Sequence, residues 1–300
     1  TYSDNISIDS NAFDNTNGSN GFVESNYDVT FATGDLIIDQ RQVELIAGRQ
    51  EKFYGDALDL DDTNFTVVDQ GDALDSALPN GEEVTNVTIG STNGIATSTT
   101  AATSLYSNEI NIESPVVGTA GTGDGFLESN YDITYVSGDL KVNPRPITVT
   151  PTQQEKIYGN TLTLDQTAFT VTDLDNDALL PNGESIDTVS VISRGAHDAS
   201  TTSSAVTYAD DLEATSVATS SAGFDLNNYT IDFSNLSDLV INRRAVTLTA
   251  LQQEKDYGDV HTLDTTTFSV TDLDNDALLP NGETIDTVTL VSADGIDAST

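Results

Sequence analysis

One seven-residue segment occurs three times in this chain and sets the scale of its architecture. The middle copy reads Gln-Gln-Glu-Lys-Ile-Tyr-Gly over residues 153–159, and related copies cover residues 49–55 and 252–258. The copies recur at a spacing of about 100 residues, which is too long for one unit of a solenoid and suits a self-contained domain. The sequence therefore predicts an array of similar domains.

The residue composition favours β-structure in these domains. Thr, Ser, Val, Ile, Asp, Asn and Gly dominate, whereas Lys and Arg together number 10 and Met is missing. The abundant residues suit strands and turns, and the scarce ones are good helix formers. No segment repeats its apolar residues with the helical period. We therefore expect an all-β fold.

The repeat that covers residues 144–242 contains seven candidate strands separated by turns. We expect them near residues 146–151, 160–164, 168–173, 185–193, 204–209, 228–233 and 238–242. The predicted core consists of Phe169, Val171, Val189, Val191, Val206, Tyr208, Tyr229, Ile231 and Phe233. Short strands without a helical segment are typical of an antiparallel sandwich. The predicted architecture is therefore a row of Ig-like antiparallel β-sandwich domains stacked end to end.

A strand–turn–strand pattern is expected to close each repeat. In one repeat it runs from the strand at residues 131–135, through Val136-Ser137-Gly138-Asp139, to a strand that begins at Leu140. It recurs at residues 27–38 and, without its glycine, at residues 229–241. Since Gly and Asp supply the backbone angles of tight turns, we expect a hairpin at each place.

Short junctions follow these patterns and define the predicted domain boundaries. The next alternating strand begins at once, so the junctions leave little slack. The predicted domains are the C-terminal part of a repeat (1–41), two full repeats (42–143 and 144–242) and the N-terminal part of a repeat (243–300). We expect either a window from a longer chain or separate chains that complete each other's end domains by strand exchange.

The order of these motifs resembles that of a known family. The motifs are the strand at 147–150, Lys156-Ile157-Tyr158-Gly159, the loop at 176–179, Asn228-Tyr229-Thr230-Ile231 and Asp238-Leu239-Val240-Ile241. Over essentially the whole chain they resemble the MBG/YDG-type repeat domains of large bacterial surface adhesins. The resemblance implies secreted, tandem β-sandwich stalk domains at the cell surface, and it carries over no catalytic residues. The chain departs from the family in its acidity and in extra aspartates where the family usually has Gly.

The charge balance limits the partners of this chain. It contains 49 acidic and 10 basic residues, and its formal net charge is −39. Such a surface repels phosphate backbones and anionic lipids. We therefore expect that the chain does not bind nucleic acid and does not insert into a membrane. Acidity favours cation binding, and adaptation to a salty medium explains it equally well.

A twelve-residue acidic segment is the candidate metal site. Residues 173–184 recur unchanged at residues 272–283, with carboxylates at positions 1, 3, 5 and 12. This spacing matches that of a calcium-binding loop. The candidate Ca²⁺ ligands are Asp173, Asp175, Asp177, Glu184, Asp272, Asp274, Asp276 and Glu283. The loop departs from the motif because Ala replaces its turn-forming Gly and Pro stands at a ligand position. A solvated acidic loop between two strands is therefore the alternative.

The basic residues are concentrated at the predicted junctions. Those in or beside a junction are Arg41, Arg49, Lys52, Lys141, Arg145, Lys156, Arg243, Arg244 and Lys255. We expect them to pair with the acidic loops of the adjacent repeat. Two alternatives stay open for the recurring lysine. Its aliphatic stem packs on the neighbouring tyrosine, or its amine forms an isopeptide crosslink.

The sequence predicts a structural function rather than catalysis. It has no Cys, so disulfides and thiolate metal sites are excluded. It also lacks a serine elbow, a phosphate loop and zinc-ligand spacing, so we do not expect an enzyme. The leading hypothesis is a stalk or filament segment of a secreted adhesin or extracellular fibre, whose partners are neighbouring repeats of the same or an identical chain.

The alternative hypothesis is multivalent binding of a surface glycan or protein by loops of the repeats. Exposed aromatic residues at equivalent loop positions would favour it. Phe13, Phe126 and Phe224 stand at such positions, but each precedes a core strand and is expected to plug the core.

Overall fold

The computed structural model describes residues 1–9, 23–70, 77–92, 94, 96–97, 99–101, 105–119, 126–175, 179–274 and 278–293. The chain forms two units. Unit 1 contains residues 1–50, 59–95 and 105–141, and unit 2 contains residues 51–58, 96–104 and 142–300. Unit 2 thus holds parts of three successive sequence repeats.

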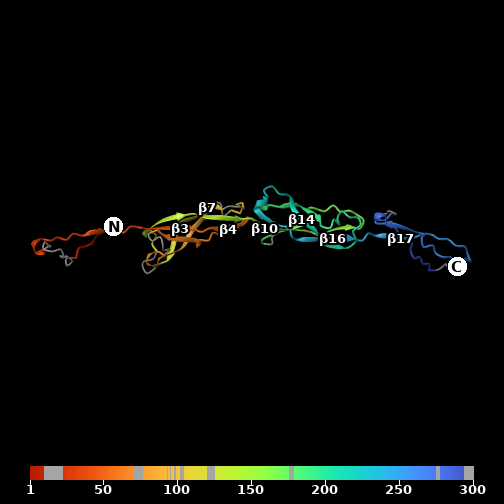
Figure 1. Ribbon diagram of the computed structural model, residues 1–300, viewed down its shortest axis with the longest axis horizontal. Coiled ribbons are helices and arrows are strands. Elements are labelled where there is room, and N and C mark those ends of the chain that lie inside the picture. Colours follow the sequence, from red (N-terminus) through yellow and green to blue (C-terminus); the bar gives the residue numbers. More distant parts are fainter. Residues whose placement is uncertain are drawn as a thin grey trace. The chain divides into compact units, whose positions relative to one another are not determined.

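The fold is all-β (Figure 1). Up to residue 143 the strands are β1 (Tyr2–Ile6), β2 (Gly34–Leu36), β3 (Arg41–Ala47), β4 (Gln50–Phe53), β5 (Phe65–Asp69), β6 (Glu83–Ser91), β7 (Tyr106–Thr119), β8 (Tyr131–Val136) and β9 (Gly138–Asn143). The later strands are β10 (Arg145–Pro151), β11 (Gln154–Ile157), β12 (Phe169–Asp173), β13 (Ile186–Ser193), β14 (Thr207–Ser220), β15 (Tyr229–Asp232), β16 (Leu236–Asn242), β17 (Val246–Ala250) and β18 (Phe268–Asp272).

The only helices in the described residues are single 3-10 turns. They are η2 (Glu24–Asn26), η3 (Pro79–Gly81), η4 (Glu128–Asn130), η5 (Pro181–Gly183), η6 (Leu226–Asn228) and η7 (Pro280–Gly282). None of these described helices is long and apolar enough to span a membrane.

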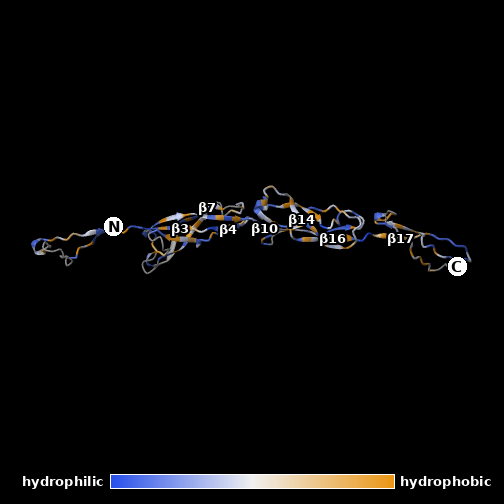
Figure 2. Cartoon of the chain, viewed as in Figure 1, coloured by the Kyte–Doolittle hydropathy of each residue, from blue (hydrophilic) through white to orange (hydrophobic). Residues whose placement is uncertain are grey.

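The segments 41–143 and 145–242 have the same sheet topology. Three strands form one sheet, in the order β5-β3-β8 or β12-β10-β15, and four form the other, in the order β4-β9-β7-β6 or β11-β16-β14-β13. In β10 every second residue is buried, and this strand packs against β14 and β16 of the other sheet. Hydrophobic residues lie on the strands of both sheets (Figure 2). This arrangement belongs to the β-sandwich class.

The sheets are mixed, so the expectation of antiparallel sheets throughout was wrong. The pairs β3–β8, β10–β15 and β11–β16 are parallel. The reason is that β8 and β9, which follow each other in the chain, belong to different sheets, as do β15 and β16. The hairpins expected at residues 131–142 and 229–241 are therefore absent. Ser137 alone separates β8 from β9, and one residue is too short for a hairpin turn, so the chain changes sheet instead.

An aspartate on the neighbouring strand supports a bulge at three places in the chain. In each of three places a residue with a left-handed backbone donates its N–H to such an aspartate, and the strand register shifts there. The pairs are Asp4–Asp35, Asn108–Asp139 and Asp210–Asp238, with N···Oδ1 distances of 3.1, 3.2 and 3.0 Å. The Gly-Asp pairs interpreted as turn residues thus belong to strands.

Six of the seven strands expected in residues 144–242 are present, and one was misplaced. Residues 160–164 form no strand, whereas residues 154–157 form β11. The strand expected at 204–209 is β14, which continues to Ser220. Asp210 and Asp211 break the alternation of apolar residues at the bulge, which hid the second half of β14 from the sequence pattern.

The core of this repeat is partly the expected one. Of the predicted residues, Val189, Val191 and Tyr229 are buried, five others are partly buried, and Val206 is exposed. The centre also contains Ile147, Val149, Leu212, Ala214, Leu239 and Ile241, all at most 2% exposed. Most of these residues lie on the strands whose extent or sheet differs from the expectation.

Candidate functional site

Arg145, the first residue of β10, is the buried centre of an ion cluster in unit 2. It is 5% exposed, and its Nε donates to Asp173 Oδ2 at 3.0 Å. Its Nη1 donates to Asp56 Oδ1 at 2.5 Å, and Asp175 accepts from Nη2. Burial by itself lowers the pKa of Arg145, but the hydrogen bonds to Asp173 and Asp56 raise it above the ordinary value. The guanidinium therefore stays charged and holds three carboxylates together.

Two tyrosines share one carboxylate beside this cluster. Tyr54 Oη donates to Glu184 Oε1 at 2.5 Å, and Tyr229 Oη donates to Glu184 Oε2. The two rings pack edge to face with centroids 5.5 Å apart, and Asn182 donates to Tyr54 Oη at 3.1 Å. Burial, followed by the hydrogen bond to Glu184, raises the pKa of both tyrosines. The hydroxyls are therefore held in the protonated form that donates.

The glycine after the tyrosine permits this close packing. Gly55 has a φ of 90°, and a Cβ added to it would lie 2.2 Å from Pro181 Cγ. A side chain at this position would therefore push the Tyr54-Gly55 turn away from η5. This contact accounts for the pairing of a Tyr-Gly turn with a Pro-Asn-Gly turn.

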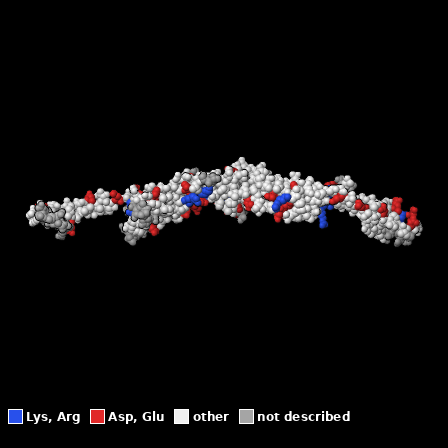
Figure 3. Space-filling model, in the orientation of Figure 1, with Lys and Arg blue, Asp and Glu red and all other residues white. Residues whose placement is uncertain are grey.

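A second cluster in unit 2 repeats this arrangement around Arg244. Its Nε donates to Asp272 Oδ2 at 2.8 Å, and Asp274 accepts from Nη2. Asn160 takes the place of Asp56 and accepts from Nη1 at 3.0 Å. The hydrogen bond to Asp272 raises the pKa of Arg244, so this guanidinium is also charged. In the face shown in Figure 3, basic side chains lie in a few groups, whereas acidic ones are scattered.

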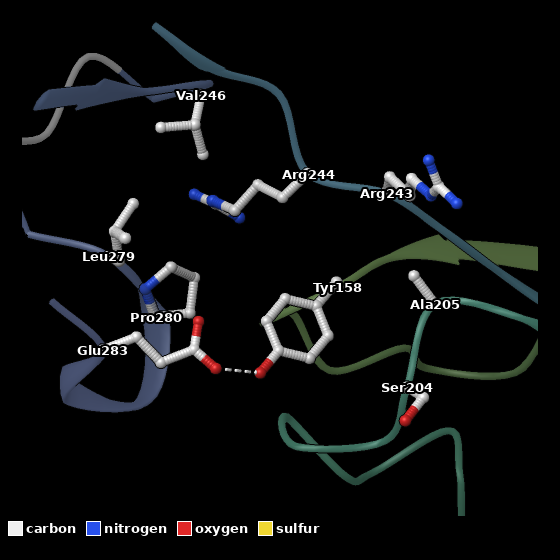
Figure 4. Close-up of a pocket in the computed structure, with 9 residues that line it drawn as sticks. All are labelled: Tyr158, Ser204, Ala205, Arg243, Arg244, Val246, Leu279, Pro280 and Glu283. Atoms are coloured by element: carbon white, nitrogen blue, oxygen red, sulfur yellow. Dashed lines mark hydrogen bonds between the residues drawn. The ribbon is translucent and has the colours of Figure 1, made fainter. Parts of the chain in front are cut away.

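The tyrosine contact is also repeated in this second cluster. Tyr158 Oη donates to Glu283 Oε1 at 2.5 Å, as Figure 4 shows. A Cβ on Gly159 would lie 2.5 Å from Pro280 Cγ. A pocket of about 450 Å³ adjoins the cluster, with Val246 among its lining residues.

Unit 1 contains a third copy of the arginine, aspartate and Pro-Asn-Gly-Glu residues that contact a Tyr-Gly turn in the other two clusters. Arg41 Nε donates to Asp69 Oδ2 at 2.8 Å, and Tyr131 Oη donates to Glu82 Oε2 at 2.6 Å. Burial, and then Glu82, raises the pKa of Tyr131. Arg41, Glu82, Tyr131 and residues 79–80 line a pocket of about 560 Å³, which no Tyr-Gly turn from the described residues fills.

The predicted calcium ligands take part in these clusters. Asp173 and Asp175 contact Arg145, Asp272 and Asp274 contact Arg244, and Glu184 and Glu283 accept from tyrosines. Asp177 and Asp276 lie outside the described residues. Within the described ranges, no group of three or more His, Asp or Glu side chains is arranged to hold a metal ion. The calcium site remains a prediction.

The recurring lysine anchors a loop. Lys156 is 7% exposed, and its Nζ donates to the backbone carbonyls of His197, Asp198 and Ser200, the latter two at 3.1 and 2.6 Å. Lys52 likewise donates to backbone carbonyls within unit 2. Burial lowers the pKa of both lysines. The lysines bind carbonyl groups here, whereas the expected partners were acidic loops or the tyrosine ring.

Sequence reasoning missed the tyrosine contacts, although a signal for them is present. Leu-Pro-Asn-Gly-Glu occurs three times, at residues 78–82, 180–184 and 279–283. It was interpreted as the end of a metal loop. A recurring Pro-Asn-Gly-Glu segment together with a recurring Tyr-Gly segment indicates two surfaces that meet once per repeat.

Comparisons with models of protein families, with curated proteins and with solved structures find no match to this chain. The function of the junction clusters must therefore be inferred from their geometry.

Proposed function

We propose that this chain is a structural segment of a stalk or filament, built from tandem Ig-like β-sandwich repeats in a secreted bacterial adhesin or extracellular fibre. The observation that supports the proposal is the junction that occurs twice in unit 2. In each copy a Tyr-Gly turn from one sequence repeat contacts the Arg and Pro-Asn-Gly-Glu residues of the next. Contacts that recur once per repeat are what a tandem array needs.

The chemistry of the junction suits a load-bearing connection. The planar guanidinium of Arg145 binds carboxylates in fixed directions, which orients the segments that supply them. One of these carboxylates, Asp56, comes from the preceding sequence repeat. The shared Glu184 carboxylate and the Gly55–Pro181 contact add two further points of attachment. Three separate contacts restrict rotation about the short connecting segment.

The connecting segment itself is short. Strand β16 ends at Asn242 and β17 begins at Val246, so three residues join them. A linker of this length adds little freedom of its own. The junction contacts therefore set the angle between repeats.

Small-angle X-ray scattering of the purified chain tests the proposal. We expect a well-defined, large maximum dimension for the wild type, and a broader distance distribution for the Tyr54→Ala/Arg145→Ala double variant. Arg194→Ala is the matched control, because Arg194 is half exposed and lies away from the junctions. Identical scattering from the wild type and the double variant would show that the junction contacts do not fix the arrangement of the repeats, and they would then no longer support a stalk function.

The two loop aromatics that the structure describes, Phe126 and Phe224, make contacts that do not favour the glycan- or protein-binding alternative. Phe224 stacks on Tyr229 at 4.9 Å and Phe126 stacks on Tyr131 at 5.3 Å, so both aromatics pack within the fold. Phe13 lies outside the described residues. A glycan array probed with the purified chain tests this alternative directly.

A further inference from the structure

We propose that the recurring lysine is a positioning residue of the junction. Lys52 and Lys156 each hold a loop of their own repeat at the place where that loop contacts the next repeat. We call these two segments the junction loops, and their described residues are 96–97 and 99–101 in one copy and 196–201 in the other. The inference rests on the proposed function, because it concerns how the junction between repeats is held together.

The first junction loop binds two asparagines of the next repeat. Thr97 Oγ1 donates to Asn182 Oδ1 at 2.9 Å, and Asn182 Nδ2 donates to the carbonyl of Thr97 at 3.3 Å. Further along the loop, the N–H of Ala101 donates to Asn228 Oδ1 at 2.9 Å. Asn228 is 2% exposed, so this bond is shielded from water. All four residues belong to unit 2, and the loop adds their contacts to those of the Tyr-Gly turn.

The second junction loop makes the corresponding contact. Asn281 Nδ2 donates to the carbonyl of Thr201 at 2.9 Å. Asn281 and Asn182 occupy the same position of two Pro-Asn-Gly turns, and their φ values are 58° and 57°. In both copies, therefore, a threonine carbonyl of one repeat meets the turn asparagine of the next.

The lysine binds the residue directly before this threonine in both copies. Lys52 Nζ donates to the carbonyl of Ala96 at 2.5 Å, and Lys156 Nζ donates to the carbonyl of Ser200 at 2.6 Å. Each of these carbonyls lies 44 residues after its lysine, so the register is the same. Because the neighbouring carbonyl is fixed, the threonine carbonyl is presented to the asparagine in a defined direction.

The first lysine also connects its junction loop to the Tyr-Gly turn. Lys52 Nζ donates to the carbonyl of Asp56 at 3.1 Å, and the Asp56 carboxylate pairs with Arg145 of the next repeat. One ammonium group therefore bridges two segments of a repeat that both contact the next one. Lysine suits this role because its ammonium has three N–H donors and no acceptor.

The second junction loop needs an anchor, because local backbone preference does not set its shape. Ala196 has a left-handed φ of 53°, which is uncommon for a residue with a Cβ. Lys156 holds this loop through the carbonyls of His197, Asp198 and Ser200. Hydrogen bonds from a charged donor are stronger than those between neutral groups. A neutral side chain in place of the lysine would therefore release the loop from its position.

Hydrogen exchange of the Ala101 amide, followed by NMR on the full chain, tests the proposal. Lys52→Met keeps an unbranched apolar side chain and removes the ammonium. Because charged hydrogen bonds are lost, Ala101 should exchange about ten-fold faster or more. Lys156→Met is the matched control, because it makes the same change in the other copy. It should leave the rate at Ala101 unchanged and shift the signals of the Asn281 side-chain amide instead.

Circular dichroism establishes that each variant is folded. If Lys52→Met does not fold, Lys52→Gln takes its place, because glutamine keeps an N–H donor without the charge. The same acceleration at Ala101 is expected from this variant.

The distance between two spin labels shows whether the lysine acts on the next repeat or only within its own. The chain has no Cys, so Thr66→Cys and Ala218→Cys, at exposed positions of two successive repeats, provide the two label sites. Pulsed electron paramagnetic resonance measures the distribution of the distance between the labels. Lys52→Met should broaden this distribution, and Lys156→Met should leave it unchanged.

The proposal fails if Ala101 exchanges equally fast in the wild type and the Lys52 variant, or if Lys156→Met accelerates it equally. It also fails if exchange rises while the distance distribution keeps its width, since the lysine would then serve its own repeat alone. A distribution that is already broad in the wild type contradicts the stiff junction of the proposed function. The exchange rate of Ala101 then decides the role of the lysine by itself.

Discussion

The Arg145 and Arg244 junctions have almost the same residues, yet their tyrosines are buried to different degrees. The arginine side chains are equally buried, at 6% and 7% exposed. Tyr54 is 3% exposed, whereas Tyr158 is only partly buried. The difference is Tyr229, which covers Tyr54 and shares Glu184 with it. No counterpart of Tyr229 covers Tyr158 in the described residues.

This comparison divides the junction into two halves. The arginine–aspartate half uses residues from the opening part of a repeat, such as Arg145 and Asp173. At Glu184 the tyrosine half also includes Tyr229 from the closing strands. Among the described residues, the first half is present in both junctions, and a second tyrosine joins the second half at Glu184.

Removal of Arg145 should have the largest effect. Arg145→Ala leaves the carboxylate of Asp173, whose side chain is 3% exposed, buried without its cation. Loss of one partner from a buried ion pair costs about 3–5 kcal/mol of unfolding free energy. Urea unfolding followed by circular dichroism measures it. The control Arg194→Ala removes an exposed pair with a 3.7 Å separation and should cost less than about 1 kcal/mol. Equal losses from the two variants would contradict the buried cluster.

The two tyrosines should respond differently to the loss of a hydroxyl. Tyr54→Phe removes a donor from the covered Glu184 and should cost about 1–2 kcal/mol. Tyr158→Phe, in the less covered junction, should have a smaller effect on the same urea midpoint. If both substitutions had the same effect, the covering role assigned to Tyr229 would be wrong.

Alkaline pH should weaken the tyrosine half selectively. Burial raises the pKa of Tyr54 and Tyr229 above the ordinary value of 10.0. The folded state therefore keeps these protons longer than the unfolded state. The stability that they contribute is fully present below about pH 10 and is lost as the pH rises further. Unfolding midpoints at pH 8 and at pH 11 measure this loss.

The variant Tyr54→Phe/Tyr229→Phe is the control for this pH effect, and it should lose less stability between the two pH values. The buried lysines act in the opposite direction, because their lowered pKa adds stability as the pH rises toward 10.5. An identical pH dependence in wild type and variant would show that the tyrosines are not responsible.

Calcium should have the smallest effect. If residues 173–184 bind Ca²⁺ with the ~10⁻⁴–10⁻³ M affinity of extracellular modules, 1 mM Ca²⁺ would stabilise the chain by roughly 0.4–1.4 kcal/mol. Thermal unfolding with Ca²⁺, and then with chelator, measures this gain. Because Asp173 already binds Arg145, metal binding must compete with the ion pair. A midpoint that does not change with Ca²⁺ would end the calcium hypothesis.

The sequence was sufficient to predict the β-class and most strands, because alternation along a strand is a local property. It could not distinguish a hairpin from a change of sheet at Ser137, since both place two alternating segments end to end. The pairing of β9 with β7, which includes the Asn108–Asp139 hydrogen bond, distinguishes the two cases, and it joins residues that are distant in the chain.

The candidate site shows the same limit. The acidic residues 173, 175 and 184 were identified correctly as a recurring set, and their charge suggested a cation. In the structure Asp173 and Asp175 pair with the guanidinium of Arg145, and Glu184 accepts tyrosine hydroxyls, while a calcium ion at these residues stays a prediction. The partner Tyr54 lies 130 residues from Glu184 and in another sequence repeat, so no local pattern could connect them.

The strand order has a mechanical consequence. A pull on the backbone enters residues 145–242 at the start of β10 and leaves at the end of β16. β10 lies between β12 and β15, and β16 lies between β11 and β14. Neither force-bearing strand is at a sheet edge, so extraction of either one must rupture two hydrogen-bonded ladders at once. At both ends of the repeat, the pulling force therefore acts on an inner strand of a sheet, which is paired on both sides.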